Sequence, residues 1–103
     1  MPLPASAVPY RIWGGYPHMH KLGRTMQVSL WDGGQDRCLA QVSDYNFSWQ
    51  QFFFYDKPVI VPPTAVGSLS ITCGYDTRGA MSTVRWGEGT ADEMCIAGLY
   101  VTL

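Results

Sequence analysis

The sequence is poor in charge and in long apolar runs, and each shortage excludes a class of protein. Only 15% of the 103 residues are charged, and the 7 basic and 8 acidic side chains nearly cancel. Because no stripe of Lys and Arg is present, a nucleic-acid partner is not expected. No apolar run approaches the ~20 residues that a membrane-spanning helix needs, so no membrane partner is expected either.

The first 17 residues also lack the apolar core of a secretory signal, because Pro2, Pro4 and Pro9 interrupt them. Two interpretations follow: a protein that starts in the cytosol, or one from which a leader and further domains have been removed. The second is preferred because of the motifs described below. Residues 1–103 suit one domain, in which residues 1–11 are interpreted as a loosely ordered leader.

Helical periodicity is missing, whereas the alternation typical of strands recurs. Met26, Val28 and Leu30 alternate with polar neighbours, and Asp32-Gly33-Gly34 then signals a tight turn. A second turn is expected at Asp56-Lys57, and Pro62-Pro63 should end a strand. Other expected strands lie near residues 10–12, 38–42, 45–49, 59–61, 69–75 and 94–101, with Cys38, Ala40 and Val42 on one face and Tyr45, Phe47 and Trp49 on another. Seven or eight short strands predict an all-β, antiparallel sandwich of the jelly-roll type.

The triplet His18-Met19-His20 holds the only two histidines of the chain. In a strand, residues i and i+2 share a face, so both imidazoles can bind one ion while Met19 points away. From these residues alone, two surface histidines are at least as good an interpretation. A thioether added to two imidazoles suits copper, particularly Cu(I). Met26 and Met81 resemble core or loop filler, whereas Met94 lies in a polar segment.

The acidic and sulfur-containing residues near Met94 leave several interpretations open. Asp92 and Glu93 can steer copper, hold a ligand loop or form a solvated turn. Three cysteines allow one disulfide and one free thiol, and none lies in a Cys-x-x-Cys pair, so a zinc knuckle is not expected.

Three segments taken together resemble a known family: HMHKLGR (18–24), ITCGYDT (71–77) and GTADEMC (89–95), with YNFSWQ (45–50) in addition. In this order, across residues 12–100, they are similar to the second copper domain of the copper type II, ascorbate-dependent monooxygenases. That family includes peptidylglycine α-hydroxylating and dopamine β-monooxygenases. The resemblance implies a jelly-roll-like sandwich, an oxygen-activating copper held by His18, His20 and Met94, and a disulfide between Cys73 and Cys95. It also implies an extracellular or periplasmic location.

The chain departs from this family in ways that affect activity. Family hydroxylases have an N-terminal domain with a three-histidine copper centre, which two histidines cannot build, so the isolated chain is not expected to be a self-sufficient hydroxylase. Ascorbate is expected as reductant only in a complete enzyme with such a domain as partner. Tyr16 replaces an arginine that binds the substrate carboxylate in peptide-hydroxylating members, and Ile96 and Gly98 replace polar substrate contacts. Neither a peptide nor a catecholamine substrate is therefore implied.

Three functions remain possible from the sequence. The chain is the oxygen-binding half of a two-domain monooxygenase, a stand-alone copper-binding module for copper handling, or a β-sandwich interaction domain with a degenerate site. The retained ligand triplet disfavours the third function. The short segment before the histidines also predicts a sandwich that is abbreviated there or completed by another chain.

Overall fold

The computed structural model describes residues 8–48, 50–62, 67–89 and 91–103, which contain six strands and no helix. A membrane-spanning helix is therefore absent from the part of the chain described. The strands are β1 (Tyr10–His18), β2 (Gly23–Trp31), β3 (Asp36–Val42), β4 (Phe53–Val61), β5 (Ser68–Tyr75) and β6 (Ile96–Thr102).

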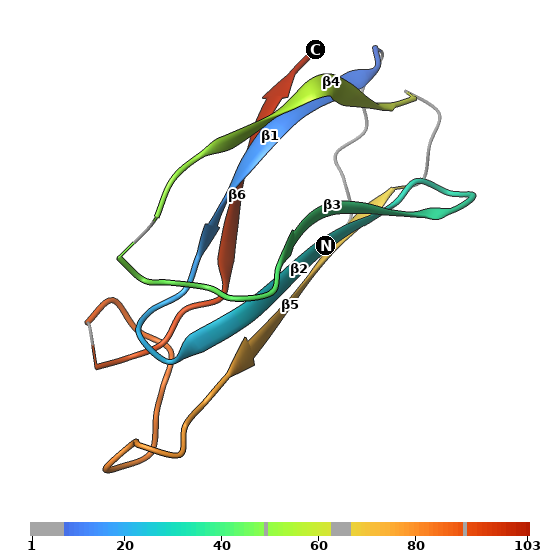
Figure 1. The fold of residues 1–103 in the computed structure, drawn as a ribbon. Helices are drawn as coiled ribbons and strands as arrows, with labels where there is room; N and C mark the ends of the chain where they lie inside the picture. The colour runs from blue at the N-terminus through green and yellow to red at the C-terminus, as the bar shows by residue number, and fades with distance from the viewer. Residues whose placement is uncertain (1–7, 49, 63–66, 90) are drawn as a thin grey trace.

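The strands form two antiparallel, three-stranded sheets that face each other (Figure 1). One sheet has the order β4-β1-β6 and the other the order β3-β2-β5, so β1 and β2 are the central strands of opposite sheets. The predicted all-β sandwich is confirmed, with six strands in the described residues where the pattern predicted seven or eight. Its core lies between the sheets and consists of Ile12, Met19, Met26, Val28, Leu30, Leu39, Tyr45 and Val61.

The strand signals around β2 were interpreted correctly. Met26, Val28 and Leu30 are at most 2% exposed and form the inner face of the strand. The turn after β2 is fixed by Asp32, whose Oδ1 accepts hydrogen bonds from the backbone N–H groups of residues 34 and 35, both at 2.9 Å. Gly33 adopts a φ of 97°, a conformation that glycine adopts without steric cost. The predicted strand over residues 69–75 is also present, as β5.

A bulge in β1 decides which side chains of that strand face outward. Ile12 pairs with Val101 and Gly14 pairs with Tyr100, so Trp13 is an extra residue relative to β6. Because neighbouring residues of β6 face opposite ways, Ile12 and Gly14 also face opposite ways, although they are two residues apart. Ile12 is buried in the core, and the residues from Gly14 to His18 follow the shifted register.

The segment over residues 45–49 was predicted to be a strand, and this was wrong. The structure has a loop there, with Trp49 outside the described residues. The cause is Tyr45, whose buried hydroxyl donates to the Met19 carbonyl at 2.7 Å and accepts from the Met19 N–H at 3.1 Å. These bonds anchor the loop beneath the connection between β1 and β2, and they outweigh the alternating pattern.

Two further details differ from the sequence prediction. The expected turn at Asp56-Lys57 is part of the continuous strand β4, although its register with β1 jumps there, between Phe54 and Val59. In β3, a bulge places Leu39 in the core and leaves Cys38 exposed, so the predicted face of β3 is wrong at its first residue.

The observed ends of the strands agree in part with the predicted ends. β1 begins at Tyr10, β4 ends at Val61 as the proline signal predicted, and β6 begins at Ile96, two residues later than expected. Residues 1–7 of the proposed leader and Pro63 lie outside the described residues. Met26 is a core residue and Met81 is fully exposed in a loop, as expected for structural filler.

Candidate metal centre

The two histidines lie where β1 leaves its sheet. His18 is the last residue of β1, and His20 belongs to the connection to β2, so the pair is not carried by one continuous strand as predicted. Their rings nevertheless meet, with centroids 5.2 Å apart and planes at 89°. Met19 between them is fully buried in the core. The expected division, with two imidazoles on one side and Met19 on the other, is therefore present.

Each imidazole is oriented by an oxygen that accepts a hydrogen bond from Nδ1. The Nδ1 atom of His20 lies 2.9 Å from the backbone carbonyl of Asp92, which can only accept, so this nitrogen is the donor. The Nδ1 atom of His18 lies 2.6 Å from Oε1 of Gln50. Neither Nε2 atom has a hydrogen-bond partner among the described residues. Metal-binding histidines have this arrangement, because the bond at one nitrogen leaves the lone pair of the other for the ion.

Glu93 joins the histidine turn to the segment that contains Met94. Its carboxylate is 8% exposed and accepts the N–H groups of His20 and Leu22, each at 2.9 Å. Oε1 is also 3.4 Å from the N–H of Met94. Of the three interpretations that the sequence left open, the structure favours a carboxylate that holds a ligand loop.

Met94 is held by its main chain on two more sides. Its carbonyl accepts a hydrogen bond of 2.7 Å from the hydroxyl of Tyr75, at the end of β5. The next residue, Cys95, forms a disulfide with Cys73 of β5, while Cys38 is free. The disulfide that the resemblance implied is therefore present. The backbone of Met94 is fixed to β5 by these bonds and to His20 through Glu93.

The described residues contain no group of three His, Cys, Asp or Glu side chains that could hold a metal ion. An ion bound by His18 and His20 thus needs a third ligand of another type, and the thioether of Met94 is the candidate in the adjacent segment. Two imidazoles and one thioether form a donor set that fits copper and suits zinc or magnesium poorly.

Comparison with known proteins shows the family to which the chain belongs. Residues 1–102 match the sequence profile of the copper type II ascorbate-dependent monooxygenase, C-terminal domain. The chain belongs to this family. It is also 32% identical over 90 residues to tyramine beta-hydroxylase of Caenorhabditis briggsae, a match that covers 86% of this chain and 15% of that protein. The monooxygenase domain described here thus spans a small part of the length of this curated relative.

The three positions that the sequence analysis singled out in this monooxygenase domain, Tyr16, Ile96 and Gly98, lie together on β1 and β6. Tyr16 pairs with Gly98, and His18 pairs with Ile96. The ring of Tyr16 stacks beside His18, with centroids 6.1 Å apart and planes at 14°. The surface next to the candidate ligand is therefore aromatic and aliphatic.

An aromatic row extends from Tyr16 along the outer face of the same sheet. Tyr16 stacks on Phe52 at 5.9 Å, Phe52 on Phe54 at 5.6 Å, and Phe54 meets the edge of Tyr100 at 5.9 Å. Phe52, Phe54 and Tyr100 are all exposed. Gly14 lies in register with both Phe54 and Tyr100, and a Cβ there would collide with the backbone carbonyl of Phe53, so glycine permits the close approach of β4.

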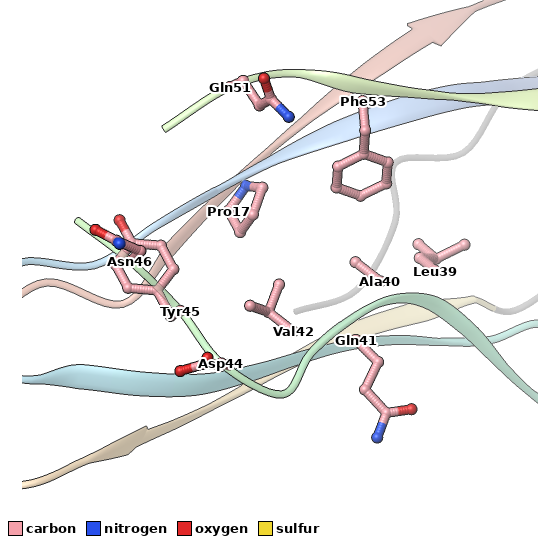
Figure 2. Close-up of a pocket in the computed structure, with 10 residues that line it drawn as sticks. All are labelled: Pro17, Leu39, Ala40, Gln41, Val42, Asp44, Tyr45, Asn46, Gln51 and Phe53. Atoms are coloured by element: carbon pink, nitrogen blue, oxygen red, sulfur yellow. The ribbon is translucent and has the colours of Figure 1, made fainter. Parts of the chain in front are cut away.

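A cleft of about 460 Å³ lies on the other side of β1, between the sheets (Figure 2). Pro17 and Phe53 from one sheet and Val42 from the other point into it (Figure 2). Its lining includes neither histidine nor Met94. The cleft is thus separate from the residues of the candidate metal centre.

The supporting roles of Gln50, which orients His18, and of Tyr45, which holds Met19, were missed by the sequence prediction. Gln50 was assigned only to an alternating pattern, and Tyr45 was treated as one strand residue among several. No local signal marks either one, because their contacts join segments more than 25 residues apart. Tyr16 was identified as a departure from the family, although its stacking on His18 was not foreseen.

Proposed function

We propose that residues 1–103 form one domain that binds one copper ion through Nε2 of His18, Nε2 of His20 and the sulfur of Met94. The observation that carries this proposal is the orientation of the two rings. Each presents Nδ1 to an oxygen acceptor and leaves Nε2 without a hydrogen-bond partner among the described residues, and the rings meet edge to face with centroids 5.2 Å apart. A copper ion in such a donor set supplies one-electron redox chemistry.

The protein contributes placement of the ligands. Glu93 holds the backbone of His20 and Met94, and the disulfide between Cys73 and Cys95 holds the other side of the methionine. Ligands fixed before the metal arrives lose little conformational entropy on binding. Met19 is fully buried next to the histidines, and Tyr16 and Ile96 lie beside His18 on β1 and β6.

We further propose that the domain is the oxygen-activating part of a longer monooxygenase. Family membership supports this role, as does the match to only 15% of a hydroxylase. Both histidines of the sequence belong to the proposed centre, so the three-histidine centre must come from an N-terminal domain of the parent protein. An extracellular or periplasmic location is proposed because the disulfide requires an oxidising compartment.

The copper site is tested by titrating the reduced metal, Cu(I), into the protein against a competing chelator. We expect about one ion per chain in the wild type and a loss of affinity exceeding ~10–100-fold in His18→Ala and in His20→Ala, since removing a ligand costs more than removing its hydrogen-bond partner. Met94→Ala should also weaken binding. Met81→Ala is the matched control, because that methionine is fully exposed in a loop. Unchanged affinity in both histidine variants would overturn the proposal.

A further inference from the structure

Gln50 lies in the loop before β4 and reaches back to the end of β1. Its side-chain nitrogen Nε2 donates to the carbonyl of Phe47 at 2.8 Å. Its oxygen Oε1 lies 2.6 Å from Nδ1 of His18 and accepts the hydroxyl of Tyr16 at 2.9 Å. All three polar contacts of this amide are therefore made within one small network.

The Phe47 carbonyl determines which way the amide is turned. A carbonyl oxygen can only accept, so the group that faces it must be the NH₂ of Gln50, and Oε1 must face His18. Because Oε1 also only accepts, Nδ1 of His18 must carry a proton in the neutral ring. The lone pair of that ring then lies on Nε2, the nitrogen that faces away from Gln50.

The two histidines differ in what supplies this acceptor. His20 is oriented by the main-chain carbonyl of Asp92, which remains when any one side chain is replaced. His18 is oriented by the side chain of Gln50, which a single substitution removes. The chain therefore contains its own internal reference, in which one imidazole depends on Gln50 and its neighbour does not.

We propose that Gln50 is a positioning residue that holds His18 in the Nδ1–H tautomer, with Nε2 presented to copper. Tyr16 supports it, because its hydroxyl binds the same oxygen of Gln50 while its ring stacks beside His18. The role toward copper rests on the proposed function, whereas the control of the tautomer does not. Outer hydrogen-bond partners of metal-binding histidines typically contribute 10–100-fold to metal affinity.

The test compares Gln50→Leu with Gln51→Leu in the full chain. Leucine has similar bulk and no acceptor, and Gln51 is an exposed neighbour that touches neither histidine. Long-range proton–nitrogen NMR correlations of the metal-free protein, recorded about two pH units above the ordinary histidine pKa of ~6.5, report the tautomer of each ring. We expect the Nδ1–H form for both histidines in the wild type and in Gln51→Leu. In Gln50→Leu, the Nε2–H form should appear at His18 while His20 keeps its signature.

Titration with Cu(I) supplies the second readout. Affinity should fall about 10–100-fold in Gln50→Leu and change less than about 2-fold in Gln51→Leu. Gln50→Glu retains an oxygen opposite His18, so it should keep the Nδ1–H tautomer, which separates the loss of the acceptor from general damage to the loop. If Gln50→Leu fails to fold, Gln50→Ala replaces it, because alanine also removes the acceptor opposite His18. An unchanged Nδ1–H form at His18 in that variant then overturns the role of Gln50.

The outcomes separate the two proposals. Wild-type protein that fails to bind Cu(I) overturns the copper function and the part of this inference that depends on it. Wild-type protein that binds Cu(I), together with a Gln50→Leu variant of equal affinity and unchanged tautomer, overturns the role of Gln50 alone. A shift of the tautomer at His18 only, with weakened binding, supports both.

Discussion

Replacing Glu93 with glutamine would remove the charge that joins the histidine turn to the Met94 segment while keeping nearly the same shape. The carboxylate is 8% exposed and accepts two backbone N–H groups at 2.9 Å, one on each oxygen. Glutamine retains a single acceptor oxygen. Its NH₂ group must then face one backbone N–H, which leaves two donors opposed in a buried place.

The expected cost follows from these two bonds. A hydrogen bond to a charged group contributes about 1.5–3 kcal/mol, and a buried donor left without a partner costs about 1–3 kcal/mol. Since one bond is retained, we expect Glu93→Gln to lower the free energy of unfolding by about 2–4 kcal/mol. For a domain of this size each kcal/mol corresponds to about 4–8 °C, so the melting temperature should fall by at least ~8 °C.

Urea unfolding of the metal-free, disulfide-bonded protein, followed by tryptophan fluorescence, measures this loss. Glu88→Gln is the matched control, because Glu88 is an exposed glutamate near Glu93 and should change stability by less than about 0.5 kcal/mol. Equal urea midpoints for the two variants would refute this role of Glu93. A loss of stability in Glu93→Gln with unchanged Cu(I) affinity would show that Glu93 holds the fold without placing the ligands.

Two other outcomes are expected. Burial raises the pKa of Tyr45 and of Tyr75, so the folded state binds their protons more tightly than the unfolded state does. Their contribution to stability is therefore complete below the unfolded pKa of ~10 and is lost as the pH rises through the folded values, which urea midpoints from pH 8 to 11 will show. Copper-loaded protein given ascorbate and oxygen should release peroxide, by transfer of two electrons to oxygen, without hydroxylating peptides or phenethylamines, and Met94→Ala should abolish the peroxide. Repeated turnover to hydroxylated product would contradict this expectation.

Local alternation predicted the strands whose two faces meet different surroundings. In β2, one face meets the core and the other meets solvent, so Met26, Val28 and Leu30 were placed correctly. The prediction failed where a distant contact overrides the local pattern. Tyr45 alternates with polar residues like a strand residue, but its hydroxyl binds both polar groups of Met19, and the segment forms a loop.

The candidate site was predicted from residue types, and its supports were not. Two histidines separated by one residue are visible in the sequence, and the Cys73–Cys95 pairing came from family resemblance. Gln50 gives no such signal, because a glutamine in a polar position is normally solvated. Only the fold brings its amide within 2.6 Å of His18.

Because Trp13 is an extra residue in β1, the side of the sheet on which the candidate metal centre lies depends on whether the number of residues in the strand is odd or even. With the bulge, Ile12 points into the core while Tyr16 and His18 point outward, although their residue numbers differ from that of Ile12 by an even number. A strand without the bulge would present His18 on the same side as Ile12, and the imidazole would enter the space between the sheets. The position of His18 therefore depends less on the length of β1 than on whether the number of residues between Ile12 and His18 is odd or even. An insertion of two residues between Ile12 and His18 keeps His18 on the outer face of β1. A single insertion or deletion there turns His18 to the inner face.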